Sequence, residues 1–447
     1  MTDTTTGTTA ADKTRLPRRW VKISFLILIC LISATLTVIV IKKFNQPPNI
    51  VLITIASLRP DWLGCYGGKK ADTAKIDALA DQGIKFTSIW TPSPDKLTTL
   101  TALVNGTITS KRGNRGSPET DRSRTLPSLL QSRGYHTAIA MGALFYDASF
   151  EPVRSLFDEV VKSPDISVRF YRARLLNEGV IPWLKKAAGK TEPFFLWIHY
   201  DDPEMPYDPP SPYFEHYSDP VFKRFPDNIN SPDFTKAFNR YAISLYAGEI
   251  TYLDRQVGQI TKTLHNTGLM KRTAVIFTSE HGETLIERDF KFSHAGLYEE
   301  VLRVPLILKL PTRQAVDIKP GATIKTPGTL VDLYGTISAI ARVSGTAGSG
   351  SETLLGKPLE EKRSSGFTFV HEWDDRMIAV RHGPFKLILP LKEFSFSPFM
   401  TYLPPNRVTN WTPGQVELYD LREDPEEKRN LARLRPDLVT DLQNLIK

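Results

Sequence analysis

The strongest indication of the fold is the segment Asn49-Ile-Val-Leu-Ile-Thr-Ile-Ala56-Ser57-Leu58-Arg59-Pro60-Asp61-Trp62-Leu63-Gly64-Cys65-Tyr66-Gly67, near the start of a 447-residue chain. Residues 50–55 form a continuous apolar run, which is typical of a strand buried on both faces of a parallel sheet. The run stops at Ala56, and a loop follows. Ala56 brings no functional group to the point where the strand meets the loop.

Strand-like and helix-like segments alternate beyond this point. Buried strands are expected at residues 137–141, 194–199, 274–279 and 304–310, and helices at 74–83, 126–133 and 238–264. This alternation predicts an α/β fold with a doubly wound, mostly parallel central sheet and helices on both faces.

The pattern changes after about residue 343. A Gly- and Ser-rich connector covers residues 345–351, and short strands are expected at 367–372, 377–381 and 385–389, with a helix from about Pro436. We therefore predict an α/β domain over residues 49–343, followed by a small C-terminal antiparallel subdomain with a terminal helix over residues 344–447.

The N-terminal region predicts a membrane anchor. Residues 23–41 carry no charge, and nineteen helical residues would rise roughly 28 Å, close to the thickness of a bilayer core. More Lys and Arg residues precede this segment than follow it, which places residues 1–22 in the cytoplasm and the main domain outside, in the periplasm if the source is bacterial. Residues 42–48 form a short linker. The alternative is a cleaved signal peptide, but the apolar run is long for one.

The charge and cysteine content limit the binding partners and disulfides that we expect. The net charge is +8, but part of it lies beside the predicted anchor, and the sequence has no glycine-rich phosphate loop, so we expect no nucleic-acid partner. The two cysteines are Cys30, inside the predicted anchor, and Cys65. The outer domain therefore has a single thiol and no internal disulfide.

Further motifs follow the opening segment in a fixed order. They are Leu79-Ala-Asp-Gln-Gly-Ile-Lys-Phe-Thr87, Tyr246-Ala-Gly-Glu-Ile-Thr-Tyr-Leu-Asp-Arg-Gln-Val-Gly258, Phe277-Thr-Ser-Glu-His-Gly-Glu283, His294-Ala-Gly-Leu-Tyr-Glu-Glu300 with Leu302-Arg-Val-Pro-Leu306, and Glu417-Leu-Tyr-Asp-Leu421. Together with the opening segment they resemble the sulfatase family of the alkaline-phosphatase-like superfamily, from Asn49 to the end of the chain. The resemblance implies metal-assisted hydrolysis of sulfate or phosphate esters by a hydroxyl-type nucleophile.

The resemblance also shows where this chain departs from the family at the nucleophile. The loop Thr91-Pro-Ser-Pro-Asp-Lys-Leu-Thr-Thr-Leu-Thr-Ala-Leu-Val-Asn-Gly106 matches the family's nucleophile loop, and Lys96 stands where a Cys or Ser is expected. Thr98 takes the Pro position and Leu100 the Arg or His position. Formylglycine cannot form at Lys96, and a lysine amine stays protonated at neutral pH. Thr98 or Thr99 is the alternative nucleophile.

The metal position departs as well. By the resemblance, Ala56 replaces a metal-binding carboxylate, Ser57 is a weaker ligand than the usual Asp, and Glu280 replaces an Asp. Glu204 stands where a His would assist the leaving group. The remaining candidates are His199 for catalysis, and Glu280, His281, His294 and Ser57 for a divalent metal such as zinc or manganese. We expect a weak metal site at best, and no other cofactor.

Three functions are compatible with this pattern. The first is a membrane-anchored pseudo-sulfatase that acts as a binding or structural subunit of a membrane assembly. The second is an active sulfuric or phosphoric ester hydrolase with a rearranged metal site. The third is a module that binds anions or sulfated glycans in the old cleft. We favour the first, because losing a nucleophile and a metal ligand each removes several kcal/mol of transition-state stabilisation, and about 1.36 kcal/mol is a factor of ten in rate.

The position of the Lys96 side chain can also be predicted. With the metal site weakened, its ammonium group is expected within roughly 4 Å of a carboxylate of Glu280 or Asp61, where it would neutralise buried acids left behind. The alternatives are that Lys96 points to solvent, and that Asp61 braces its loop through Arg59.

Overall fold

The computed structural model describes residues 46–108, 122–142, 148–163, 173–218, 232–312, 318–343, 352–355, 367–396 and 409–446, together with 27–29, 31 and 33. The chain divides into two units, Met1–Pro47 and Pro48–Lys447. Most of the predicted anchor at residues 23–41 and the connector at 345–351 lie outside the described residues. Within the described part of the chain, no helix has the length and apolar character needed to cross a membrane.

A mixed β-sheet forms the centre of the second unit. In the described residues it has nine strands in the order β4-β3-β5-β1-β6-β7-β2-β8, with β9 also paired to β2. The strands are β1 (Asn49–Ile55), β2 (Ile84–Trp90), β3 (His136–Met141), β4 (Glu159–Val160), β5 (Phe194–Tyr200), β6 (Thr273–Ser279), β7 (Arg303–Lys309), β8 (Ala322–Ile324) and β9 (Gly328–Thr329). Only β7 runs antiparallel to its neighbours in this described sheet, β6 and β2. The α/β class is confirmed, but the antiparallel strand was not predicted.

The opening segment supplies the central strand. β1 pairs in parallel with β5 on one side and with β6 on the other, so that Thr54 lies opposite both His199 and Thr278. All seven residues of β1 are buried. Val51, Ile53 and Ile55 pack into one core, whereas Ile50 and Leu52 pack into the core on the opposite face. Burial on both faces therefore explains the unbroken apolar run, as the sequence predicted.

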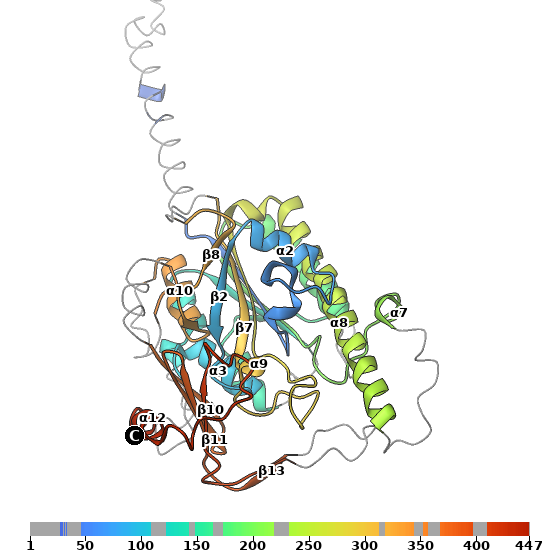
Figure 1. Ribbon diagram of the computed structural model, residues 1–447. Coiled ribbons are helices and arrows are strands. Elements are labelled where there is room, and N and C mark those ends of the chain that lie inside the picture. The colour runs from blue at the N-terminus through green and yellow to red at the C-terminus, as the bar shows by residue number, and fades with distance from the viewer. Residues whose placement is uncertain are drawn as a thin grey trace, which may run out of the picture. The chain divides into compact units, whose positions relative to one another are not determined.

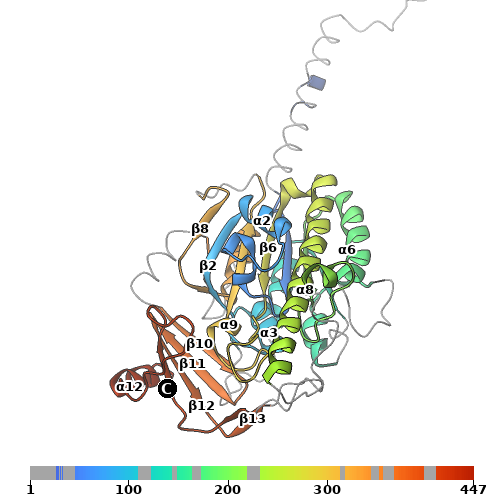
Figure 2. The same cartoon turned by 45° about the vertical axis from the view of Figure 1, so that its right-hand side comes forward.

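Helices cover both faces of the sheet (Figure 1). One core contains side chains of α2 (Ala74–Asp81), α6 (Ala173–Ala188) and the 35-residue α8 (Pro232–Asn266). The other contains side chains of α3 (Lys96–Asn105), α4 (Leu126–Gln131) and α10 (Asp332–Ile340). Figure 2 shows α6 and α8 side by side on their face. The short helices are α5 (Glu151–Arg154), α7 (Tyr213–Tyr217) and α9 (Glu299–Leu302).

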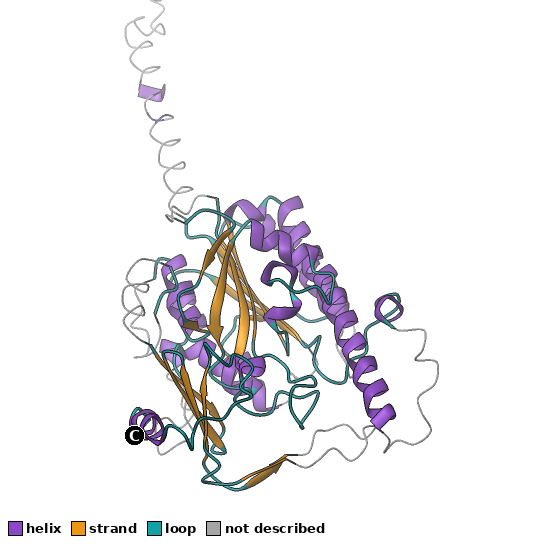
Figure 3. Cartoon of the chain, in the orientation of Figure 1, coloured by secondary structure: helices purple, strands orange, loops and turns teal. Residues whose placement is uncertain are grey.

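A second, smaller sheet forms the C-terminal region (Figure 3). Its order is β10-β11-β12-β15, with every pair antiparallel, and a ribbon of β13 and β14 lies apart from it. The strands are β10 (Thr368–Trp373), β11 (Met377–His382), β12 (Phe385–Pro390), β13 (Phe394–Phe396), β14 (Thr409–Trp411) and β15 (Glu417–Asp420). The terminal helix α12 (Pro436–Asn444) packs against β11 and β12. The predicted antiparallel region and terminal helix are confirmed.

The carboxyl ends of three neighbouring strands meet at one edge of the large sheet. The ladder continues one residue past β1 and β6, because Ala56 N donates to Tyr200 O (2.9 Å) and Glu280 N donates to Ile55 O (2.9 Å). Ala56, Asp201 and Glu280 therefore follow strands that end side by side. In open α/β sheets, this edge is where ligands bind.

Candidate functional site

The amino end of α3 lies at this edge and presents Lys96. Asp95 is the N-cap, and its side chain accepts a hydrogen bond from Thr98 N (2.8 Å). Lys96 is consequently the first residue of the helix. The N-terminal end of a helix favours negative ligands. Lys96 instead places a cation there, so its charge needs acidic side chains from the loops that follow the strands at this edge.

Three carboxylates surround the Lys96 ammonium group. Lys96 Nζ lies 2.7 Å from Glu204 Oε2, 3.2 Å from Asp201 Oδ1 and 3.7 Å from Glu280 Oε1. The Lys96 side chain is only 13% exposed, and Glu280 is fully buried. The expected contact between Lys96 and Glu280 is confirmed, and the solvent-facing alternative is wrong. Asp61 instead forms a two-bond ion pair with Arg59, at 3.0 Å for each bond.

The electrostatics of this cluster favour the charged forms of Lys96, Glu280 and Glu204. Burial lowers the pKa of Lys96, but Glu204, Glu280 and Asp201 raise it more, so that it lies well above its usual value. Burial raises the pKa of Glu280, but Lys96 and His199 lower it to about 2. The pKa of Glu204 is also lowered, because Lys96 outweighs burial. An amine held in this way has no free lone pair to act as a nucleophile.

The hydroxyl groups of Thr98 and Thr99, the two alternative nucleophiles, form hydrogen bonds that stabilise the start of α3. Thr98 Oγ1 donates to Asp95 Oδ1 (2.5 Å). Thr99 is fully buried, and its hydroxyl contacts Ser93 O (2.9 Å) and Thr91 Oγ1 (3.0 Å). Each hydroxyl thus has a local structural partner rather than a general base. Leu100, at the position where the family resemblance implies Arg or His, is fully buried in the core beneath α3.

His199 lies at the end of β5 and faces the same carboxylates. Its Nδ1 is 2.8 Å from Thr54 Oγ1, which also accepts a hydrogen bond from Trp197 Nε1 (2.8 Å). Its Nε2 is 3.5 Å from Glu280 Oε2 and 3.6 Å from Asp201 Oδ1. Burial lowers the pKa of His199 below its usual value, although the nearby Glu280 and Asp201 act in the opposite direction. Thr54 therefore orients His199 toward the acids.

His281 and His294 come together on the other side of Glu280. Their ring centroids are 4.6 Å apart, and His281 Nε2 lies 3.3 Å from Glu280 Oε1. Glu204, His281 and His294 offer ligand atoms that all lie within 4.8 Å of one another. Burial lowers the pKa of His294 to about 4. Burial also lowers that of His281, but Glu280 and Glu204 raise it more, so it lies above its usual value.

The first-strand positions offer little to a ligand. Ala56 is fully buried and supplies no donor atom. Ser57 is also fully buried, has a φ of 54°, and lies beside Glu283, whose pKa its hydroxyl lowers. The role of Ser57 as a weak metal ligand stays a prediction, and Glu280 lies 3.3 Å from His281 of the cluster formed by Glu204, His281 and His294.

Two residues at the site were not singled out from the sequence. Asp201 follows β5 directly and contacts both Lys96 and His199. Glu283 is buried, which raises its pKa to about 7, and it accepts a hydrogen bond from Tyr207 OH (2.9 Å). The signal for both was position, since each is an acid that closely follows the carboxyl end of a predicted strand.

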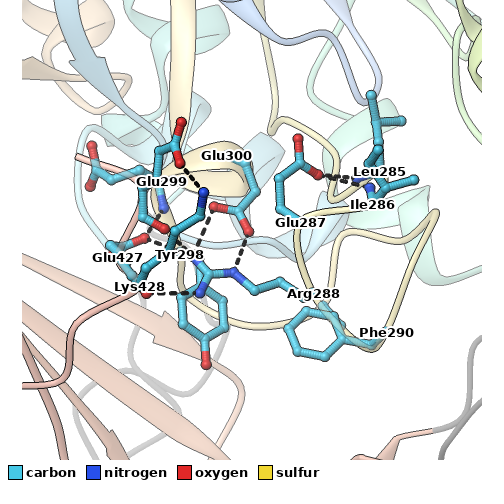
Figure 4. Close-up of polar contacts among 12 residues, drawn as sticks. Leu285, Ile286, Glu287, Arg288, Phe290, Tyr298, Glu299, Glu300, Glu427 and Lys428 are labelled. Carbon is cyan, nitrogen blue, oxygen red and sulfur yellow. Dashed lines mark hydrogen bonds and ion pairs between the residues drawn. The ribbon is translucent and has the colours of Figure 1, made fainter. Parts of the chain in front are cut away.

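The loop that carries His294 is fixed to the C-terminal region (Figure 4). Thr284 and Ser293 form a bridge that closes the loop just before His294. Arg288 donates to Glu300 Oε1 (2.7 Å) and to Glu427 O (3.0 Å). Glu427 Oε2 in turn accepts from Glu299 N (2.7 Å). The C-terminal region therefore positions one wall of the site.

The sheet order, the helices on both faces and the acidic and imidazole groups at the carboxyl edge define an alkaline-phosphatase-like fold. The sulfatase family model matches residues 48–343, and the chain belongs to the sulfatase family. The uncharacterized sulfatase YidJ of Escherichia coli K12 is 26% identical over 86% of this chain and 83% of its own length. An arylsulfatase of Clostridium perfringens is 23% identical over 86% of this chain and 90% of its own length. The solved phosphonate monoester hydrolase of Agrobacterium radiobacter shares the fold with a TM-score of 0.67 and 17% identity, covering 89% of this chain and 94% of that one.

Sulfatases usually use a divalent metal, and this chain fits one only in part. Its side chains include a candidate ligand set, Glu204, His281 and His294. However, Glu204 is already bonded to the Lys96 ammonium group, and Ala56 leaves the first strand without a carboxylate. A metal at these residues would polarise an ester oxygen, but Lys96 holds a competing positive charge at the same place.

Proposed function

We propose that this chain is a pseudo-sulfatase, which keeps the family fold but does not hydrolyse sulfate or phosphate esters, and that it acts as a binding or structural subunit. The observation that carries the proposal is the Lys96 ammonium group. It stands at the family's nucleophile position and is held by Glu204, Asp201 and Glu280. A hydrolase of this family needs a nucleophile there, and a protonated amine is not one.

The same ion pairs argue against a module that binds anions through Lys96. A sulfate ester would have to compete with three carboxylates already at 2.7–3.7 Å from the amine, and those carboxylates would repel it. The old cleft is therefore a poor sulfate site, and the binding role falls to other surfaces of the fold.

Turnover measurements test the proposal. The purified full-length chain is incubated with p-nitrophenyl sulfate, p-nitrophenyl phosphate and an aryl phosphonate, with Mg²⁺, Ca²⁺, Mn²⁺ or Zn²⁺, beside the arylsulfatase of Clostridium perfringens as a positive control. We expect no turnover above the rate of a buffer blank. Turnover that a chelator abolishes would overturn the proposal and favour a metal-bound water as nucleophile, especially if it survives in a Thr98→Ala, Thr99→Ala variant.

We further propose that residues 23–41 anchor the protein in a membrane, with the N-terminus in the cytoplasm and the main domain outside. The support is the charge-free run and the excess of Lys and Arg before it. In this arrangement, partners would be other subunits of a membrane assembly. Protease added to intact spheroplasts should digest the main domain, and its survival, or a mature N-terminus beyond residue 34, would overturn the proposal.

A further inference from the structure

The charges around Lys96 do not balance. Three carboxylates, those of Asp201, Glu204 and Glu280, lie within 3.7 Å of a single ammonium group. Glu280 is fully buried, and its oxygens face the ring nitrogens of His281 (3.3 Å) and His199 (3.5 Å) rather than a second full cation. Buried carboxylates are stable only when cations or hydrogen-bond donors meet them. The cleft therefore holds more negative charge than Lys96 alone neutralises.

The two histidines beside these acids are arranged as ligands. His281 is fully buried, and its Nδ1 lies 2.9 Å from Gly282 O, so this nitrogen carries the proton. Its Nε2 faces the acidic cleft, 3.3 Å from Glu280 Oε1, and becomes available to a metal when it gives up its proton. Metal-binding histidines commonly donate their other ring N–H to a backbone carbonyl in this way. His294 packs against His281 at 4.6 Å between ring centroids.

We propose that Glu204, His281 and His294 form a latent transition-metal site that Lys96 keeps closed by acting as an internal cation. This inference rests on the proposed function, since it explains how the fold keeps its acidic cleft without relying on the family's metal. Two imidazole nitrogens and one carboxylate oxygen form a ligand set suited to Zn²⁺, with a coordination position left open.

Lys96 and a metal exclude each other because they need the same carboxylate. The ammonium group lies 2.7 Å from Glu204 Oε2, whereas Zn²⁺ binds carboxylate oxygens at about 2.0–2.2 Å. A metal at Glu204 would therefore lie close to a second positive charge in a buried place, where like charges are poorly screened. Neutralising residue 96 removes that repulsion and frees Glu204 to act as a ligand.

Calorimetric titration with Zn²⁺ at neutral pH tests this inference on the full-length chain. We expect Lys96→Met and Lys96→Gln to bind one Zn²⁺ at least 100-fold more tightly than the wild type. Co²⁺ bound to either variant should give the visible absorption bands of a four- or five-coordinate site. Adding His294→Ala to either variant should abolish the gain, because it removes a ligand and leaves the charge at residue 96 unchanged.

Lys392→Met is the matched control. It removes one positive charge from an exposed ion pair with Asp375 (2.6 Å) in the C-terminal region, and it should not change Zn²⁺ affinity. Lys96→Gln keeps a polar side chain, so it provides the readout if Lys96→Met does not fold. The inference is overturned if neither variant binds Zn²⁺ more tightly than the wild type, or if the wild type already binds it equally tightly. Ester turnover by the wild type would count against the proposed function, whereas these affinities decide the latent site independently.

Discussion

Two buried charge clusters in this molecule can be compared directly. One surrounds Lys96 at the edge of the large sheet, where three carboxylates share one ammonium group. The other joins the large domain to the C-terminal sheet. There, three cations face three carboxylates, which are Arg288, Arg381 and Lys386 with Glu299, Glu300 and Glu427.

The difference lies in how well each cluster is satisfied. At the junction, every one of the three carboxylates has a cation within 3.2 Å, and Glu299 also accepts a hydrogen bond from Trp90 Nε1 (2.9 Å). In the cleft, one ammonium group serves three carboxylates, and it lies 3.7 Å from the buried Glu280. A balanced cluster is what a structural joint requires. The cluster in the cleft lacks that balance, because it has one cation for three carboxylates.

Lys386 should give the largest effect, because the junction depends on it. Its side chain is fully buried and contacts Glu427 Oε1 (2.7 Å) and Glu299 Oε1 (3.2 Å). Lys386→Met removes the cation nearest to Glu427 and leaves Glu299 with Arg381 alone, and we expect it to lower the free energy of unfolding by about 3–5 kcal/mol. Urea denaturation measures this, with the exposed Lys392→Met as control. A loss no larger than that of the control would mean that the junction is not a structural joint.

Glu299 provides a pH test of the same joint. Burial raises its pKa, but Lys386 and Arg381 lower it more, from 4.5 to about 2. A carboxyl group with a lowered folded-state pKa stabilises the fold above its unfolded value and loses that contribution as the pH falls toward the folded value. Glu299→Gln should therefore cost about 3 kcal/mol at pH 7, since hydrogen bonds to a charged group are lost. The difference in free energy of unfolding between Glu299→Gln and the wild type should become smaller as the pH falls from 4.5 to 2. A constant difference across that range would show that the charge of Glu299 is not what matters.

Lys96 should give a smaller effect, because Asp201 and Glu204 are each 18% exposed and water can solvate them once the ammonium group is gone, whereas Lys386 and Glu427 are fully buried. Lys96→Met is expected to lower the free energy of unfolding by about 2 kcal/mol. The double variant Lys96→Met, Glu204→Gln should recover at least half of this, because the two residues are in direct contact at 2.7 Å and their effects are not additive. Additive losses in the double variant would mean that Lys96 stabilises the fold by packing rather than by neutralising acids.

Much of the fold was predictable because its signal is local. The apolar run before Ala56 predicted a strand buried on both faces, and β1 is that strand. The capping glycine at Gly106, with a φ of 66°, ends α3 where the nucleophile-loop match placed it. The direction of β7 could not be read in the same way, since a run such as residues 304–310 is equally apolar in a parallel or an antiparallel strand.

The site was predictable residue by residue but not as a set. The contact of Lys96 with Glu280 followed from charge, because an acid left without its cation needs another one. Asp201 and the pairing of Glu204 with the two histidines depend on how the loop after β5 folds back over the edge, and no local pattern encodes that. Sequence order also gave no hint that Arg288 and Glu427, 139 positions apart, would fix the loop that carries His294.

The smallest effect concerns the start of α3, where geometry rather than charge balance holds the site. Asp95 Oδ1 accepts hydrogen bonds from both the backbone N and the Oγ1 of Thr98. Asp95→Ala removes this N-cap and should cost about 1 kcal/mol, whereas Asp95→Asn keeps an acceptor and should cost a few tenths, about 0.3 kcal/mol. Thermal unfolding of the two variants measures the difference. If Asp95→Ala costs no more than Asp95→Asn, the cap does not position Lys96. If Asp95→Ala also creates ester turnover, the Thr98 hydroxyl is a nucleophile that its cap restrains, and the contrast between a structural joint and an inactive cleft no longer holds.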